Sequence, residues 1–152
     1  MKCSDLKIFA VVTAVAVMCG LVTTVCAHEY YTALFKIIHP WAVATAPGAS
    51  TAPVYLKFEE VSAGDRLIGA RSDIAGAVEL RGGAANDVGS RPSNALAAIN
   101  VEPGITTELA PEGMHLVLID LKAPLQLGRS YPLTLIFEKS GAIDTMLSVG
   151  AD

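Results

Sequence analysis

The sequence predicts an all-β domain, an antiparallel β-sandwich or barrel, preceded by an N-terminal signal segment. Three observations lead to this fold class. After residue 27 the apolar residues recur with a period of two, which is the spacing of strands and not of helices. Short segments rich in Gly, Pro and Asp interrupt these runs at regular intervals. Only residues 93–99 are compatible with a short helical turn, so no helical layer is expected.

Residues 1–27 have the organisation of a signal peptide. Lys2 and Lys7 give a short positive region, residues 8–25 are almost wholly apolar, and small residues occupy the positions that signal peptidase reads before a cleavage after Ala27. An uncleaved membrane anchor is the alternative, because the apolar run approaches the length of a membrane span. No charged stop-transfer flank follows the run, which favours cleavage and export to the periplasm.

All three cysteines of the chain lie in this signal segment, so the mature domain, residues 28–152, has neither a thiol nor a disulfide. This composition suits an oxidising compartment, and it excludes thiolate catalysis, zinc ribbons and iron–sulfur ligation. Lipoprotein processing at Cys19 or Cys26 is a weaker alternative, because Met18 and Val25 precede them where Gly or Ala would be expected.

The mature domain has 125 residues, the 152 of the chain less the 27 of the signal segment, which suffices for one hydrophobic core. It carries 9 basic and 14 acidic side chains, a net charge of −5, and no cluster of four or more basic residues. Nucleic acid is therefore not expected as a partner. Association with a membrane is expected only through an uncleaved signal segment.

Eight strands are predicted in the mature domain, each as an apolar or alternating run between turn signals. In chain order they span residues 34–38, 54–58, 66–70, 77–81, 105–109, 115–121, 133–138 and 143–149. The turn signals between them lie at residues 46–48, 63–65, 82–83, 102–104, 111–113, 127–128 and 140–141. Segment 42–52 is too short for a linker and is expected to be an ordered crossing loop.

The strand from His115 is predicted to be central in the sheet, because both of its faces are apolar. Val117, Ile119 and Leu121 share one face with His115, while Leu116 and Leu118 lie on the other. His115 stands at the loop-proximal end of this strand, where β-sandwiches carry functional residues.

Signals for an enzyme are poor. Glu59 and Glu60 are adjacent in an extended segment, so they point to opposite faces and cannot act as one acid–base pair. Residues 48–52 resemble a nucleophile elbow only loosely, because no helix follows them. Residues 81–83 lack the Lys and the Ser or Thr of a phosphate-binding loop. The prediction is that the chain is not an enzyme.

Three histidines, His28, His39 and His115, and two methionines, Met114 and Met146, are the candidate metal ligands of the mature domain. Imidazole and thioether donors without cysteine suit copper above other metals. A structural role is the alternative for each of them. His115 would then be held by a backbone carbonyl, His39 would bond a backbone group at the first crossing, and both methionines would pack in the core.

Several motifs in the right order resemble the bacterial periplasmic copper chaperones called PCu(A)C. The matching segments are His28-Glu29-Tyr30, His39-Pro40-Trp41-Ala42, Ala46-Pro47-Gly48, Tyr55-Leu56, Gly113-Met114-His115-Leu116, Leu121-Lys122-Ala123-Pro124-Leu125 and residues 132–141. The resemblance covers most of the mature chain. It implies a cupredoxin-like Greek-key β-sandwich that binds Cu(I), with a copper-centre subunit of cytochrome oxidase or another copper chaperone as partner. It also makes His115 an inherited ligand position.

The ligand set departs from the family's pattern around His115. Val117 stands where the family has Met, and Arg81 stands where it has His. The Met-rich hairpin that follows has shrunk to residues 84–91, with Ser90 near the position of its Met. Valine donates nothing and a permanently charged guanidinium repels a cation, so the usual site is not expected to work in its usual form.

Two hypotheses follow from this departure. In the first, the protein still handles copper, through His115 with other ligands or through His28, which after cleavage offers a terminal amine and an imidazole as one chelate. An amine titrates at about 8 and an imidazole at about 6.5, so both are available near neutral pH. In the second, the usual copper site is lost and the domain is a periplasmic protein-interaction module.

Overall fold

The computed structural model describes residues 29–83 and 94–150, and every regular element within these ranges is a strand. The strands are β1 (Glu29–Tyr31), β2 (Lys36–Val43), β3 (Thr51–Glu59), β4 (Asp65–Arg71), β5 (Ala77–Gly82), β6 (Asn94–Ala95), β7 (Ile99–Val101), β8 (Thr107–Leu109), β9 (His115–Ile119), β10 (Ser130–Phe137) and β11 (Gly141–Gly150). The all-β prediction is confirmed. Over the same ranges, no helix has the length and apolar character needed to cross a bilayer.

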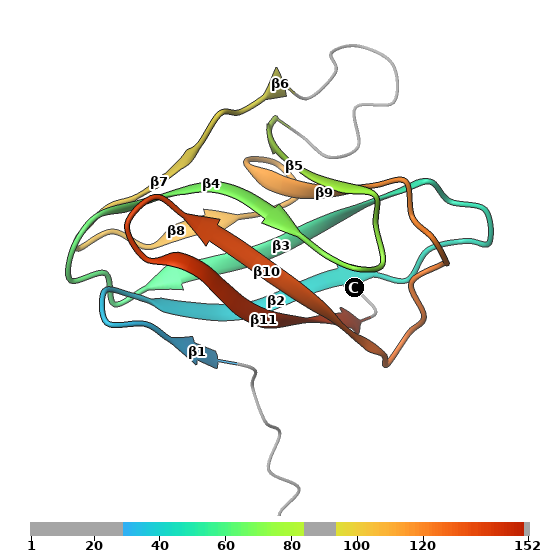
Figure 1. Ribbon diagram of the computed structural model, residues 1–152, viewed down its shortest axis with the longest axis horizontal. Coiled ribbons are helices and arrows are strands. Elements are labelled where there is room, and N and C mark those ends of the chain that lie inside the picture. Colours follow the sequence, from blue (N-terminus) through green and yellow to red (C-terminus); the bar gives the residue numbers. More distant parts are fainter. Residues whose placement is uncertain (1–28, 84–93, 151–152) are drawn as a thin grey trace, which may run out of the picture.

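Seven of these strands pair into a closed ring, in the order β2-β11-β10-β4-β5-β9-β3 and back to β2 (Figure 1). Strand direction alternates in an antiparallel ring, so a ring with an odd number of strands needs one parallel pair. That pair is β2 with β11, at Trp41–Ser148 and the two pairs that follow. The prediction of a wholly antiparallel sheet is wrong here. The order β10-β4-β5-β9 within this ring is that of a Greek key, because β10 returns to lie beside β4.

Strand β2 changes its neighbour half-way along its length. Its first half pairs with β1, ending at Ile38 opposite Glu29, and its second half pairs with β11 from Trp41 onward. The register with β3 shifts between these two halves. His39 lies at the shift with a left-handed backbone (φ 45°) and an exposed side chain, and Pro40 follows it. Proline has no N–H to donate, so this point suits a bulge.

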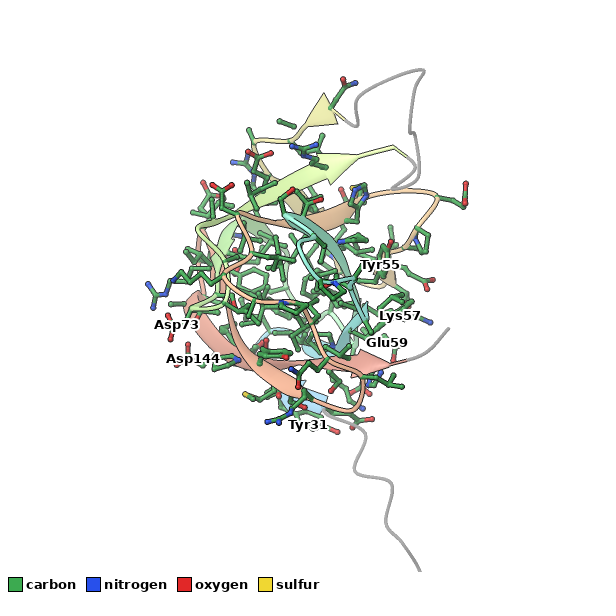
Figure 2. The ribbon with its side chains drawn as sticks, turned by 90° about the vertical axis from the view of Figure 1, so that its right-hand side faces the viewer. Tyr31, Tyr55, Lys57, Glu59, Asp73 and Asp144 are labelled. Carbon is green, nitrogen blue, oxygen red and sulfur yellow. The ribbon has the colours of Figure 1, made fainter. Side chains whose placement is uncertain are left out.

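The core lies inside the ring and follows the alternation of the strands. In β3, Val54, Leu56 and Phe58 point inward and are at most 1% exposed. Figure 2 shows Tyr55, Lys57 and Glu59 along the opposite, outer side of the same strand. In β9, Leu116 and Leu118 are fully buried. Placing β9 between β3 and β5 confirms the prediction of a central strand.

The buried carboxylate of Asp65 joins β4 to the turn between β10 and β11. It accepts hydrogen bonds from the backbone N–H groups of Arg66 (2.7 Å), Lys139 (2.9 Å) and Ser140 (2.9 Å) and from the Ser140 hydroxyl (2.7 Å). Burial by itself raises the pKa of Asp65, but these hydrogen bonds outweigh it and hold the pKa below its ordinary value.

The helical turn expected at residues 93–99 is not formed in the part that the structure describes. Residues 94–95 form β6, beside β5, and Ile99–Val101 forms β7, beside β4. Ile99 pairs with Leu67 and is 1% exposed, so burial against a distant strand overrides the local pattern. These two strands and β1 were too short to predict.

Candidate metal sites

A small buried cluster lies on the outer side of the barrel, over β3 and β9. Tyr55 is 4% exposed, His115 1% and Val117 9%, although all three point away from the core. Trp41 packs on Tyr55 with ring centroids 4.8 Å apart, and Tyr55 lies 6.4 Å from the His115 ring. Outward residues of a barrel are normally exposed, so the burial of these three side chains distinguishes this part of the outer surface.

The imidazole of His115 is held by the backbone. Its Nδ1 lies 3.0 Å from the carbonyl oxygen of Gly113. Because a carbonyl only accepts, Nδ1 carries a proton and donates it to Gly113. This is the structural role considered for His115. The same contact between a ring nitrogen and a carbonyl orients metal-ligating histidines, so the geometry is compatible with both roles.

Two described neighbours of His115, Arg81 and Val117, offer no soft donor. The register places Arg81 of β5 directly opposite His115, and Val117 follows two residues along the same face. The Arg81 guanidinium is paired with Glu79, whose Oε2 accepts from Nε at 3.0 Å and from Nη2 at 2.7 Å. A cation held by a carboxylate therefore stands opposite His115, at the position where the resemblance implies a copper ligand.

The other predicted candidates are dispersed. Met114 is half-buried and packs against the core, as expected for a packing residue. Met146 lies in the middle of β11 on its outward face, between the buried Thr145 and Leu147. His28 falls outside the described residues. Within residues 29–83 and 94–150, no three His, Cys, Asp or Glu side chains come together as a metal site.

Of the two histidines that the structure describes, His39 is the exposed one and His115 is buried. Its exposed side chain lines a small pocket of about 80 Å³ together with Trp41 and Glu108. The backbone pairing between β1 and β2 ends one residue before it, at Glu29 and Ile38. Sequence reasoning assigned His39 a backbone partner. Only the pairing of β1, a strand too short to predict, could have shown that His39 lies next to the end of the β1–β2 ladder.

The sequence matches the family described as "Putative lipoprotein LpqE-like" over residues 35–149. This chain belongs to the LpqE-like family. The family is related to the PCuAC proteins, and two solved structures support that relation, so the predicted resemblance is confirmed.

The copper-bound PCuAC domain from PmoF2 is 30% identical, with a TM-score of 0.68 over 82% of this chain and 99% of that domain. The apo PCuAC domain from PmoF1 is 28% identical, with a TM-score of 0.69 over 82% and 100%. Cu(I)-DR1885 from Deinococcus radiodurans is 18% identical, with a TM-score of 0.63 over 84% and 83%, and shows the shared fold alone.

A curated relative adds information on export. "Putative lipoprotein Lxx21020" of Leifsonia xyli subsp. xyli is 32% identical over 71 residues, which are 47% of this chain and 43% of the relative. The match therefore spans less than half of the relative's length. Both this name and the family description refer to lipoproteins, which are exported proteins.

Proposed function

We propose that this LpqE-like protein is an exported copper-binding protein that carries Cu(II) at its mature N-terminus. The ligands are the terminal amine and imidazole of His28, after cleavage behind Ala27, and the imidazole of His39. The observation that supports this proposal is that the β1–β2 pairing ends at Glu29 and Ile38, which are the sequence neighbours of His28 and His39.

The chemistry of these donors fits Cu(II). An amine and two imidazoles give three nitrogen ligands, and tetragonal nitrogen sites are typical of Cu(II). The thioethers that Cu(I) prefers are missing from the His115 cluster, where Val117 replaces Met and Arg81 brings a positive charge. We therefore favour the N-terminal site and keep His115 as the alternative that the experiment separates.

The relatives support copper handling. A PCuAC domain described as copper-bound shares 30% of its residues with this chain over nearly its whole length. Nothing in the comparisons favours the alternative of an interaction module without a metal. We also propose that the protein delivers its copper to a copper-centre subunit of cytochrome oxidase or to another copper chaperone, as the resemblance implies. Export to the periplasm through a signal peptide formed by residues 1–27 is part of the same proposal. No enzymatic activity is proposed.

The test is a Cu(II) titration of the protein that begins at His28, in competition with free histidine. Four matched variants separate the sites: His28→Ala, His39→Ala, His115→Ala, and a chain with one Ala added before His28. Trp41 is the single tryptophan and lines the same pocket as His39, so its fluorescence should fall on Cu(II) binding. Electron paramagnetic resonance reports the nitrogen ligands.

We expect a Kd below about 1 μM for the unaltered protein. The added residue and His39→Ala should each weaken binding by about tenfold or more, while His115→Ala leaves it unchanged. Loss of binding in His115→Ala alone would move the site to His115. Affinity no better than that of free histidine would end the copper proposal and leave the interaction module.

A further inference from the structure

We infer that Glu108 of β8 is a further Cu(II) ligand, which shares a pocket on the outer side of the barrel with His39 of β2. The inference deepens the proposed function, because His39 is one of the ligands proposed there, and it rests on residues of β2, β3 and β8 alone. The carboxylate oxygen that joins the imidazole makes the site select Cu(II) over Cu(I).

The backbone of β2 brings the His39 imidazole to the surface through a bulge. In a regular strand His39 would share the inner face with Ile37, which is fully buried. The register between β2 and β3 shifts after Ile38, and His39 takes a left-handed backbone (φ 45°) with an exposed side chain. Non-glycine residues adopt this conformation uncommonly, and such positions are frequent at functional sites. The bulge therefore presents an imidazole where regular alternation would bury it.

Strand β3 sets Lys57 between His39 and Glu108. Lys57 pairs with Ile38 of β2 on one side and with Glu108 of β8 on the other, and His39 follows Ile38 directly. Figure 2 shows Lys57 on the outer side of β3. An imidazole, an ammonium and a carboxylate from three neighbouring strands therefore meet on one face of the barrel.

These three side chains line one pocket of about 80 Å³. Trp41 lines it as well, together with the core residues Leu56 and Leu109, each 1% exposed. Pockets for organic ligands measure about 300 Å³ or more, so this one suits an ion with a few waters. Because the apolar side chains exclude water from one side of the pocket, its donors attract a cation more strongly than fully exposed ones would.

Lys57 already holds a positive charge at this carboxylate. Its Nζ lies 3.5 Å from Glu108 Oε1. The two side chains are 45% and 53% exposed, so the ion pair contributes little to stability and is readily exchanged. A Cu(II) ion carries twice the charge of the ammonium and also binds the imidazole, so it displaces Lys57, whose flexible stem lets the ammonium move into solvent.

The donor types decide which copper ion this pocket accepts. A carboxylate with an imidazole suits Cu(II), whereas Cu(I) prefers thioether and thiolate sulfur. No methionine is among the described residues that line the pocket. Loss of the Glu108 carboxylate should therefore weaken the binding of Cu(II) and leave that of Cu(I) unchanged.

The experiment compares Glu108→Gln with Glu138→Gln in the protein that begins at His28. Glu138 is the matched control, because it also forms a half-exposed ion pair, with Arg66 at 3.4 Å, but it lies just after β10. Cu(II) and Cu(I) affinities, the electron paramagnetic resonance spectrum of the Cu(II) form and the melting temperature are measured for both.

Three further substitutions identify the partners of Glu108. His39→Asn removes the imidazole and keeps a residue that tolerates the left-handed backbone, and it is combined with Glu108→Gln in a double-mutant cycle. His28→Ala shows whether the effect of Glu108 depends on the start of the mature chain. Lys57→Met removes the competing ammonium and keeps a side chain of similar length.

We expect Glu108→Gln to weaken Cu(II) binding about three- to tenfold and to change the resonance spectrum, while Glu138→Gln alters neither. With His39→Asn in place, Glu108→Gln should have no further effect, because the two ligands act on one ion. With His28→Ala, the effect should persist. Lys57→Met should strengthen Cu(II) binding about two- to fivefold. A purely structural role of Glu108 would lower the melting temperature without this coupling to His39.

Unchanged Cu(II) affinity in Glu108→Gln, or an equal loss with and without the His39 imidazole, would overturn the inference and leave the proposed function standing. If adding Ala before His28 has no effect while Glu108→Gln and His39→Asn remain coupled, the N-terminal chelate of the proposed function fails and the inference stands. If the unaltered protein binds Cu(II) no better than free histidine, both fail.

Discussion

Replacing Arg81 by His and Val117 by Met together should create a Cu(I) site at His115. The register places residue 81 opposite His115 and residue 117 on the same face. The Gly113 carbonyl already orients the imidazole through Nδ1. The double substitution therefore adds an imidazole and a thioether around a ligand that is already in position, and it removes a positive charge.

The size of the effect follows from charge and from donors. At about 4 Å and an effective dielectric of about 20, a guanidinium repels Cu(I) by roughly 4 kcal/mol, near a thousandfold in affinity. Glu79, at 2.7 Å from Arg81, offsets part of this repulsion. If half remains, removing the charge alone gives about thirtyfold. With two added donors we expect Cu(I) affinity to rise by at least about a hundredfold.

The assay is an anaerobic Cu(I) titration against a coloured chelator, performed on the chain with one Ala added before His28 so that the N-terminal site is silent. Arg81→His with Val117→Ile is the matched control, because it removes the same charge and fills similar space without a thioether. X-ray absorption should show a copper–sulfur distance only in the Met variant. If the Met variant binds Cu(I) no better than the unaltered chain, then Arg81 and Val117 are not what prevents Cu(I) binding at His115, and the reasoning is wrong.

Three further predictions concern stability. Asp65→Ala should lower the free energy of unfolding by about 3 kcal/mol and the melting temperature by about 10 °C at pH 7, because buried amides lose a charged acceptor. The native pKa of Asp65 lies below its ordinary value. Its contribution to stability is therefore complete above about pH 4, the unfolded pKa, and is lost as the pH falls through the native pKa. The difference in melting temperature between Asp65→Ala and the unaltered protein should shrink in acid, and a constant difference would contradict the prediction. Leu116→Ala, at a fully buried site, should cost about 2–5 kcal/mol in urea unfolding, and a loss below 1 kcal/mol would mean that the core collapses around the gap. His115→Gln should destabilise the fold by about 1–3 kcal/mol, and full retention of stability would show that the bond to Gly113 contributes nothing.

The sequence predicted well what depends on local pattern. Strand β9 was placed from its apolar run, and its alternation put Val117 on the face of His115. The all-β class and the central position of β9 followed in the same way. The core positions of β3 also follow from a period of two, because that period needs no knowledge of what the strand pairs with.

Where local pattern was weak, the predictions failed. Residues 94–101 carry little periodicity, and their two short strands form only because β4 and β5 offer edges to pair with. His39 was assigned a backbone partner from its place before Pro40. Its exposure instead results from β2 exchanging β1 for β11, which no run of neighbouring residues encodes.

The sequence by itself determined the fold class and the confinement of cysteine to residues 1–27, and its resemblance predicted the departures at residues 81 and 117. Only the tertiary structure decided which strands close the ring, that Arg81 lies opposite His115, and that β1 begins at Glu29, opposite Ile38. The reason is physical. Alternation along a strand is set by local backbone geometry, whereas register and strand order are set by which distant surfaces bury one another.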